Sequence, residues 1–323
     1  MKNVSKMALI SSILLLILAF LFFKKEGRES AEIVKKICIC KAIEHEALNS
    51  VVDGISHYLK QSNNGCEVFV ETSQGNAALA SQIITKFLTS KADVIATIGT
   101  SPSQCAFKLA KDGKIKLVFS SVTNPSDISP DLVETNTTGV SNFVDLDPQI
   151  KLFKRIQPSL LKLGIVYNPT ESNSTSIVKE LKRVCERNSI QLFEQGLSRL
   201  SDIPQALSSL LYSVDAVFIS NDNLALSGIT SIVSICNQRK IPVYVSDTDQ
   251  VKNGCIASLG PNQYDIGIQT GKIIEQIING KDINLIPISY PDVCEIHINL
   301  KAARSLNIEI PEEVLKQAKM LYD

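Results

Sequence analysis

The chain has 323 residues, and its 33 Lys and Arg balance 33 Asp and Glu to give a formal net charge of +0. This length suits two domains or lobes better than one small core. The balanced charge gives no overall field that would draw the chain to nucleic acid. Hydrophobic residues make up 44% and charged residues 20%, which is typical of a globular protein.

An apolar run near the N-terminus predicts a membrane segment. Residues 7–23 carry no charge, and only Ser11 and Ser12 are polar. A helix rises about 1.5 Å per residue, so this run is just long enough to span a bilayer. It ends in Phe-Leu-Phe-Phe-Lys-Lys, without the small residues of a cleavage site. We expect residues 1–25 to be a signal anchor, with a cleaved signal peptide as the alternative, and residues 26–34 to be a tether.

From residue 35 onward, short apolar segments alternate with segments of helical periodicity. The predicted strands of the first half are residues 36–43, 67–71, 94–98 and 117–119, and its clearest predicted helices are residues 46–60 and 76–88. The second half repeats this design, because residues 92–104 resemble 214–226 and residues 115–125 resemble 241–251. Strands that alternate with helices form parallel sheets covered on both faces. The sequence therefore predicts an α/β fold of two similar Rossmann-like lobes.

The stretch from Leu163 to Thr175 combines a strand, a polar turn and a helix start. Pro169 cannot continue a strand ladder, so the strand ends before it. Ser172, Asn173 and Ser174 are residue types that accept hydrogen bonds from the free N–H groups of a helix start. Such a helix start also suits an anion, for example a carboxylate. A capped connection without a ligand is the alternative interpretation.

Polar residues follow the predicted strands at several further points. Ligands of open parallel sheets bind beyond the carboxyl ends of the strands, so two facing lobes would enclose a polar cleft. An amino-acid zwitterion fits such a cleft, because charge-assisted hydrogen bonds could hold both of its charges. The candidates for its carboxylate are Thr100, Ser101, Ser172 and Ser174, and those for its ammonium are Asp222 and Asp247.

Several of these candidates have a second interpretation. Asp222 could equally cap the helix that begins near Leu224. Asp247 and Asp249 could form a catalytic pair of carboxylates or lie in a solvated loop. Glu171 falls in a first helical turn, where a carboxylate is favourable anyway, and it could hold a cation.

Signals of enzymes and metal sites are missing from the sequence. The first strand is not followed by GxGxxG, and neither GxxxxGK nor GxSxG occurs. The eight Cys form no CxxC pair and no zinc spacing with His, so buried free thiols are expected, although a disulfide remains open. His45 starts a helix and could reach the cleft. We therefore predict no catalytic residue, no metal and no cofactor.

Three motifs together resemble a known family. Residues 168–174 read NPTESNS, residues 221–223 read NDN, and Gly267, Thr270 and Gly271 form a GxxTG motif. They are similar to the substrate-binding proteins of ABC transporters with the periplasmic binding protein type I fold, in the TrpX-like branch that includes aromatic amino-acid binders. The resemblance covers residue 35 to the C-terminus. It departs at His45-Glu46, where the family often has His-Pro, and in the lack of a lipoprotein Cys.

The resemblance implies a periplasmic cleft binder that closes by a hinge motion and delivers its ligand to an ABC permease in the membrane. It also implies that lobe 1 comprises residues 35–145 and 264–285, and lobe 2 residues 146–263 and 286–323. The family's binding positions map onto Thr100, Ser101, Thr123, Glu171, Ser172, Asn173, Ser174, Asp222 and Asp247.

We accordingly predict the solute-binding component of an ABC importer, which captures a small amino-acid-like ligand and is tethered to the membrane or exported with its first segment cleaved. Because the chain has no Trp, a residue that stacks on an aromatic ligand would be Phe, Tyr or His, such as His45, Phe143 or Tyr264. The alternatives are a membrane-anchored sensing ectodomain of the same fold and, further off, a two-domain α/β enzyme.

Overall fold

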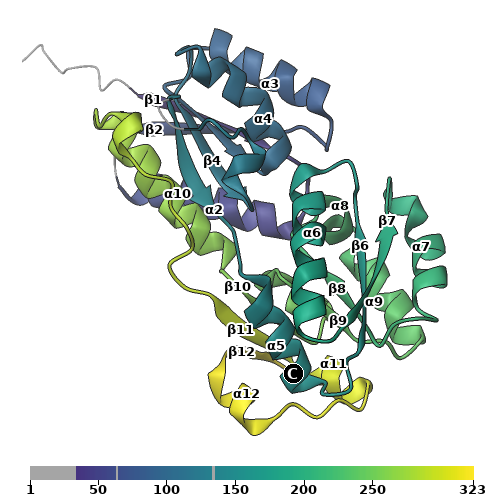
Figure 1. Cartoon of the computed structure of the whole chain (residues 1–323). Coiled ribbons are helices and arrows are strands. Elements are labelled where there is room, and N and C mark those ends of the chain that lie inside the picture. The colour runs from purple at the N-terminus through teal and green to yellow at the C-terminus, as the bar shows by residue number, and fades with distance from the viewer. Residues whose placement is uncertain (1–33, 63–64, 133–134) are drawn as a thin grey trace, which may run out of the picture.

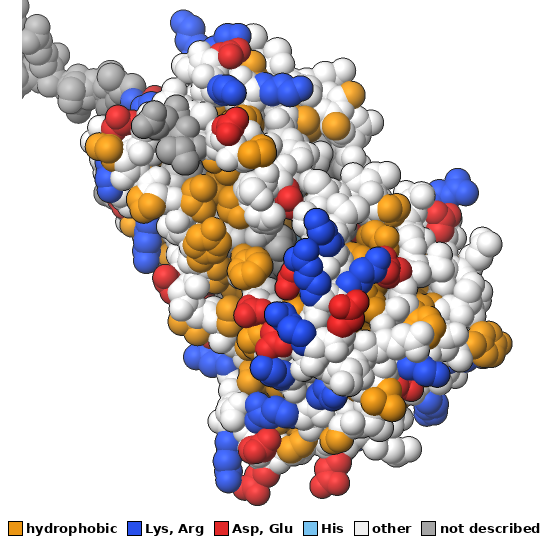
Figure 2. All heavy atoms as spheres, viewed as in Figure 1, with side chains coloured by type: hydrophobic (Ala, Val, Ile, Leu, Met, Phe, Trp, Pro, Cys, Tyr) orange, Lys and Arg blue, Asp and Glu red, His pale blue; other side chains and the backbone are white. Residues whose placement is uncertain are grey.

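The computed structural model describes residues 34–62, 65–132 and 135–323, which form two α/β lobes (Figure 1). The predicted membrane segment, residues 1–25, lies outside the described residues, as does most of the predicted tether. Within the described residues, no helix is long and apolar enough to cross a membrane. Basic and acidic side chains are interspersed over the face of the molecule seen in Figure 2.

The first sheet has five parallel strands in the order β2-β1-β3-β4-β5. Its strands are β1 (Lys35–Lys41), β2 (Cys66–Thr72), β3 (Val94–Ile98), β4 (Leu117–Val122) and β5 (Thr137–Ser141). The helices around it are α2 (Glu46–Gln61), α3 (Ala77–Thr89), α4 (Thr100–Lys111), the 3-10 turn η1 (Pro125–Asp127) and, from far along the chain, α10 (Gln263–Ile278) and η4 (Ile283–Leu285). Strands β3, β4 and β5 are buried along their whole length, as expected for a parallel sheet covered on both faces.

The second sheet has seven strands in the order β12-β11-β10-β9-β8-β6-β7. Its strands are β6 (Lys162–Tyr167), β7 (Gln191–Gly196), β8 (Ala216–Ile219), β9 (Val243–Val245), β10 (Ala257–Gly260), β11 (Glu295–Asn299) and β12 (Ala318–Tyr322). Its helices are α5 (Leu146–Ile156), α6 (Ser172–Arg187), α7 (Ile203–Leu210), α8 (Asn223–Ser227), α9 (Ile229–Gln238), α11 (Leu300–Ser305) and α12 (Glu312–Gln317), with the 3-10 turns η2 (Leu200–Asp202) and η3 (Thr248–Asn253).

This sheet is parallel except where β10 pairs with β11 in antiparallel fashion. The prediction that both sheets are parallel is therefore wrong for this pair of strands. The chain leaves the sheet at the end of β10, enters α10 beside the first sheet, and comes back into β11. The chain re-enters the sheet at the same end of the strands at which β10 finishes. Strand β11 therefore runs opposite to β10.

Close helix packing joins α10 to the first lobe. The apolar face of α10, with Ile266 and Ile274, belongs to the same buried cluster as Val51 of α2. A Cβ on Gly54 would lie 2.2 Å from the backbone oxygen of Tyr264, so only glycine allows the two helices to approach so closely. Helix α10 is thereby fixed to the first lobe, although it follows the strands of the second.

The chain passes three times between the sheets, at residues 142–145, 261–262 and 290–294. Before the third passage, Ser289 pairs with Val140 in parallel fashion and extends the first sheet beyond β5. These three passages are the chain segments that connect the two sheets. The domain boundaries expected from the sequence stay a prediction.

Candidate ligand-binding cleft

The two lobes touch across the ends of their parallel strands. Several hydrogen-bonded contacts join them, among which Gln104 Nε2 donates to Ser172 Oγ at 3.2 Å, Ser176 Oγ donates to Asp127 Oδ1 at 3.0 Å, and His45 Nε2 lies 3.4 Å from Asn223 Oδ1. An ion pair between Glu46 and Lys252 also joins them. The cleft is therefore closed.

A small polar cavity of about 20 Å³ remains between the lobes. His45, Thr100 and Thr123 line it from the first lobe, and Asn173, Asn221 and Asp247 line it from the second. A space of this volume holds about one water molecule. The residues that follow the strand ends of both lobes thus meet at this small polar cavity, as expected for two facing parallel sheets.

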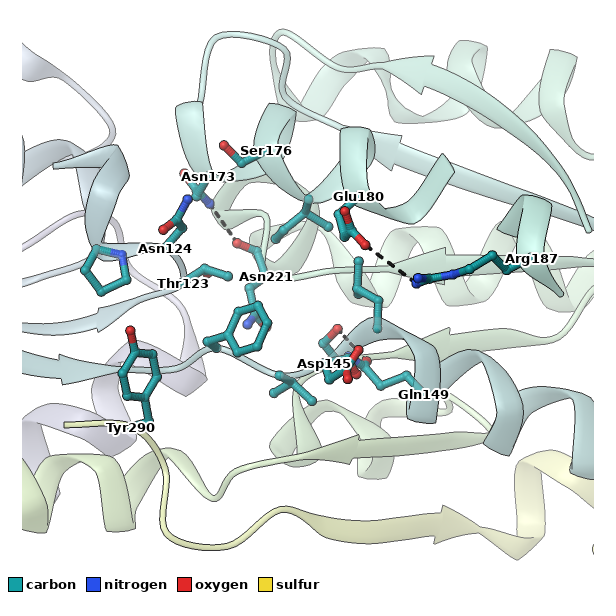
Figure 3. Close-up of a pocket in the computed structure, with 16 residues that line it drawn as sticks. Thr123, Asn124, Asp145, Gln149, Asn173, Ser176, Glu180, Arg187, Asn221 and Tyr290 are labelled. Atoms are coloured by element: carbon teal, nitrogen blue, oxygen red, sulfur yellow. Dashed lines mark hydrogen bonds and ion pairs between the residues drawn. The ribbon is translucent and has the colours of Figure 1, made fainter. Parts of the chain in front are cut away.

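A larger cavity of about 600 Å³ adjoins the small one, because Thr123, Asn173 and Asn221 line both. Its wall also contains apolar side chains, among them Phe143 and Ile177. Figure 3 shows Tyr290 and Asn124 at one end of this cavity and the Glu180–Arg187 pair at the other. A third cavity, of about 430 Å³, is lined by Ser101, Glu171, Ser172 and Asn173 together with residues of the first lobe.

Asp247 is the most unusual carboxylate of the cleft. It follows β9 and caps η3, and its Oδ1 accepts a hydrogen bond from the N–H of Asp249 at 2.9 Å. The side chain is 1% exposed, and burial, followed by the charge of Asp249, raises its pKa to about 8. Among the described residues, none donates a hydrogen bond to its second oxygen. Asp247 can therefore receive a cation at the small cavity.

His45 lies across the same cavity, immediately before α2. Its Nδ1 is buried and has no hydrogen-bond partner among the described residues. Burial lowers its pKa to about 4, so the ring is neutral at physiological pH. A neutral ring with a free nitrogen can donate to a ligand or accept from it.

Asp222 has a different environment. Its carboxylate accepts hydrogen bonds from the N–H of Asn168 at 2.6 Å, the hydroxyl of Ser174 at 2.6 Å and the N–H of Ala225 at 2.7 Å. Both oxygens are engaged and the side chain is fully buried. Asp222 therefore caps α8, as in the second interpretation given above, and its carboxylate also holds the 168–174 turn against this helix.

Glu171 lies beside Asp222 and accepts hydrogen bonds from Asn223 Nδ2 at 2.6 Å and from Asn168 Nδ2 at 3.2 Å. Burial, followed by the nearby Asp222, raises its pKa to about 7. The acidic pair is thus surrounded by amides and N–H groups.

The predicted ligand-binding residues separate into three groups in the structure. Thr100, Thr123, Asn173 and Asp247 line the small cavity; Ser101, Glu171 and Ser172 line the third cavity; and Ser174 and Asp222 bond to each other outside these cavities. Sequence reasoning missed Asn142 and Gln263, which line the small cavity, and Tyr290 in the large one. Asn142 directly follows β5 and Gln263 begins α10, but neither lies in one of the strand–polar loop–helix units from which the site was predicted.

Comparison with known proteins decides the family. The family model described as ABC transporter substrate binding protein matches residues 36–321. The chain belongs to this family. It is thus a solute-binding component of an ABC transporter, and proteins of this family are typically extracytoplasmic.

Three relatives are informative for this substrate-binding protein. A tyrosine-binding protein of Clostridioides difficile is 28% identical over 285 residues, which cover 85% of this chain and 81% of the relative. The ABC domain of Streptococcus pneumonia in complex with L-Trp is 27% identical, with a TM-score of 0.84 over 89% of this chain and 99% of that one. A ligand-free, open substrate binding protein of Clostridium difficile is 28% identical, with a TM-score of 0.67 over 90% of this chain and 99% of that one.

The two structural comparisons differ in fit although the sequence identities are nearly equal. This substrate-binding protein fits the L-Trp complex better than the open, ligand-free structure. The closed arrangement of its lobes rests on the contacts across the cleft.

Proposed function

We propose that this substrate-binding protein captures a single amino acid between its lobes, leaves it chemically unchanged and presents it to an ABC permease. The observation that carries the proposal is Asp247, a buried carboxylate with one oxygen free at the small cavity. An amino acid brings an ammonium, for which such a group is a strong partner.

The first lobe offers the complementary half of the site. Thr100 begins α4, where backbone N–H groups have no partner within the helix. Thr123 presents a hydroxyl that donates to Asn142 Oδ1 at 3.0 Å in this arrangement. These donors suit the carboxylate of the ligand, while Asp247 suits its ammonium. The two charged ends of the head group would thus be held by opposite lobes.

An amino-acid head group is larger than the one-water space now present, so it enters only after the lobes have separated. We infer a hinge motion about the three passages, in which the first sheet moves with α10 and residues 286–289 as one lobe, and the second sheet moves with its helices as the other. The relatives that bind L-Trp and tyrosine make an aromatic amino acid the first ligand to test. We further propose that residues 1–25 hold the protein at the outer side of the membrane or are cleaved during export.

The test is thermal unfolding of the full chain with each of the twenty amino acids, several sugars and a few purines, followed by calorimetry of the compounds that raise the melting temperature. A ligand present at a hundred times its dissociation constant adds about 2.7 kcal/mol to the free energy of unfolding. We expect an amino acid to bind and Asp247→Asn to weaken that binding strongly. Asp112→Asn, which changes an exposed carboxylate after α4, is the matched control. Shifts produced only by sugars or purines would refute the proposal.

A further inference from the structure

Two large aromatic side chains are left half exposed where the chain passes between the lobes. Phe143 is 48% exposed and Tyr290 is 55% exposed, and both line the large cavity. By contrast, Phe119, Phe153 and Phe218 are fully buried in the lobe cores. Figure 2 shows apolar side chains at the surface beside the junction of the lobes.

Backbone hydrogen bonds hold these two residues on neighbouring segments. The N–H of Phe143 donates to Ser141 Oγ at 2.9 Å, directly after β5. Tyr290 directly follows Ser289, whose backbone bonds to Gly139 and Ser141 of β5. Both aromatic residues therefore lie directly beside residues that are hydrogen-bonded to β5, and both line the cavity.

The cavity that they line adjoins the small polar cavity of the cleft. Thr123, Asn173 and Asn221 form its boundary with the small cavity that contains Asp247. A volume of about 600 Å³ is within the range of small-molecule sites. A ligand whose head group lies at Asp247 would therefore extend its side chain into this space.

We propose that Phe143 and Tyr290 are specificity-determining residues that receive the side chain of the ligand, and that they select α-amino acids with a flat aromatic ring. A ring packed against them removes apolar surface from water and gains the edge or offset contacts that aromatic pairs prefer. The Glu180–Arg187 pair at the far end provides polar partners for a substituent on that ring, such as a hydroxyl. This inference rests on the proposed function, because it assumes an amino-acid head group at Asp247.

The absence of Trp from the chain provides a direct readout. Excitation at the red edge of the indole band excites only added L-Trp, so its emission reports the surroundings of the bound ring. We expect the emission of L-Trp to shift to shorter wavelength when it binds the full-length protein. Phe143→Ala and Tyr290→Ala should each weaken L-Trp binding by about tenfold or more and reduce this shift. Phe143→Leu, which keeps apolar volume, should have a smaller effect.

Tyr212→Ala is the matched control, since Tyr212 is 75% exposed and packs on Arg239 away from the cavities. It should leave both the affinity and the emission shift unchanged. If the protein binds L-Trp and the two cavity variants retain its affinity and its emission shift, the inference is overturned while the proposed function stands, and the exposed aromatics belong to a protein-docking surface. If only aliphatic or polar amino acids bind, the inference again fails alone. If no amino acid binds, the proposed function fails first.

Discussion

The proton on Asp247 should couple ligand binding to pH. Burial and Asp249 raise the pKa of Asp247 to about 8, Glu46 adds to this effect and Lys252 opposes it. A ligand ammonium beside the carboxylate favours its charged form and lowers that pKa in the complex. The complex then holds fewer protons than the empty protein, so affinity rises with pH up to the pKa of the empty state and levels off above it. Each pH unit below it costs about 1.4 kcal/mol, or tenfold in affinity.

Calorimetry with the amino acid that binds, for instance L-Trp, checks this expectation. Binding should be up to about 100-fold weaker near pH 6 than near pH 8, because two pH units separate these conditions. Titrations in two buffers with different ionisation enthalpies should show release of close to one proton. Asp247→Asn should bind weakly with little dependence on pH, whereas Asp112→Asn should keep the wild-type slope. Equal wild-type affinity at the two pH values would show that Asp247 is not the partner of the ammonium.

Three further predictions concern stability. Asp222→Asn should lower the free energy of unfolding in urea by about 3 kcal/mol, because charge-assisted hydrogen bonds from three donors depend on the carboxylate. Ser174→Ala removes one of these donors and should lower it by about 1 kcal/mol. An unchanged free energy of unfolding for Asp222→Asn would contradict this role. Gly54→Ala should destabilise the protein by about 3 kcal/mol, because the new Cβ clashes with α10. Gly196→Ala is the control and should change stability by less than about 1 kcal/mol, because its new Cβ would lie 3.6 Å from the Pro169 ring. Similar losses in the two variants would argue against the helix clash. Without ligand, the melting temperature should fall as pH rises from about 5 to about 8. Glu171 and Asp247 have raised pKa values, so the folded state binds more protons than the unfolded chain in this range. A melting temperature that rises over the same range would refute this prediction.

Much of the fold could be predicted from the sequence because its main signals are local. Strands β1 and β3 of the first sheet each contain a short apolar run and are each followed by a helix, and this order favours a parallel α/β sheet. The antiparallel pairing of β11 and the extension of the first sheet by Ser289 could not be predicted in this way. Both depend on the path of the chain between the lobes, which leaves no periodic pattern in the sequence.

The candidate site could be predicted only in part for a similar reason. Asp222 and Asp247 both follow a short buried strand and precede a helix, so the sequence treats them alike. The structure separates them by what surrounds each carboxylate: N–H and hydroxyl donors of its own lobe satisfy Asp222, while Asp247 keeps one oxygen free. Phe143 is one of the aromatic candidates that the sequence offers, and its role as a partner of the ligand stays a prediction. Tyr290 is not among these candidates.

The packing of the lobes indicates where the energy for closure comes from. Each of the four apolar clusters among the described residues lies within a single lobe, and none spans the cleft. The side-chain contacts that join the lobes across the cleft are hydrogen bonds and one partly exposed ion pair, which contribute about 1 kcal/mol or less each once competing water is considered. Opening the cleft therefore exposes no hydrophobic core. A ligand that bonds to both lobes at once adds interactions that exist only in the closed state, and so it can shift the balance between the two arrangements.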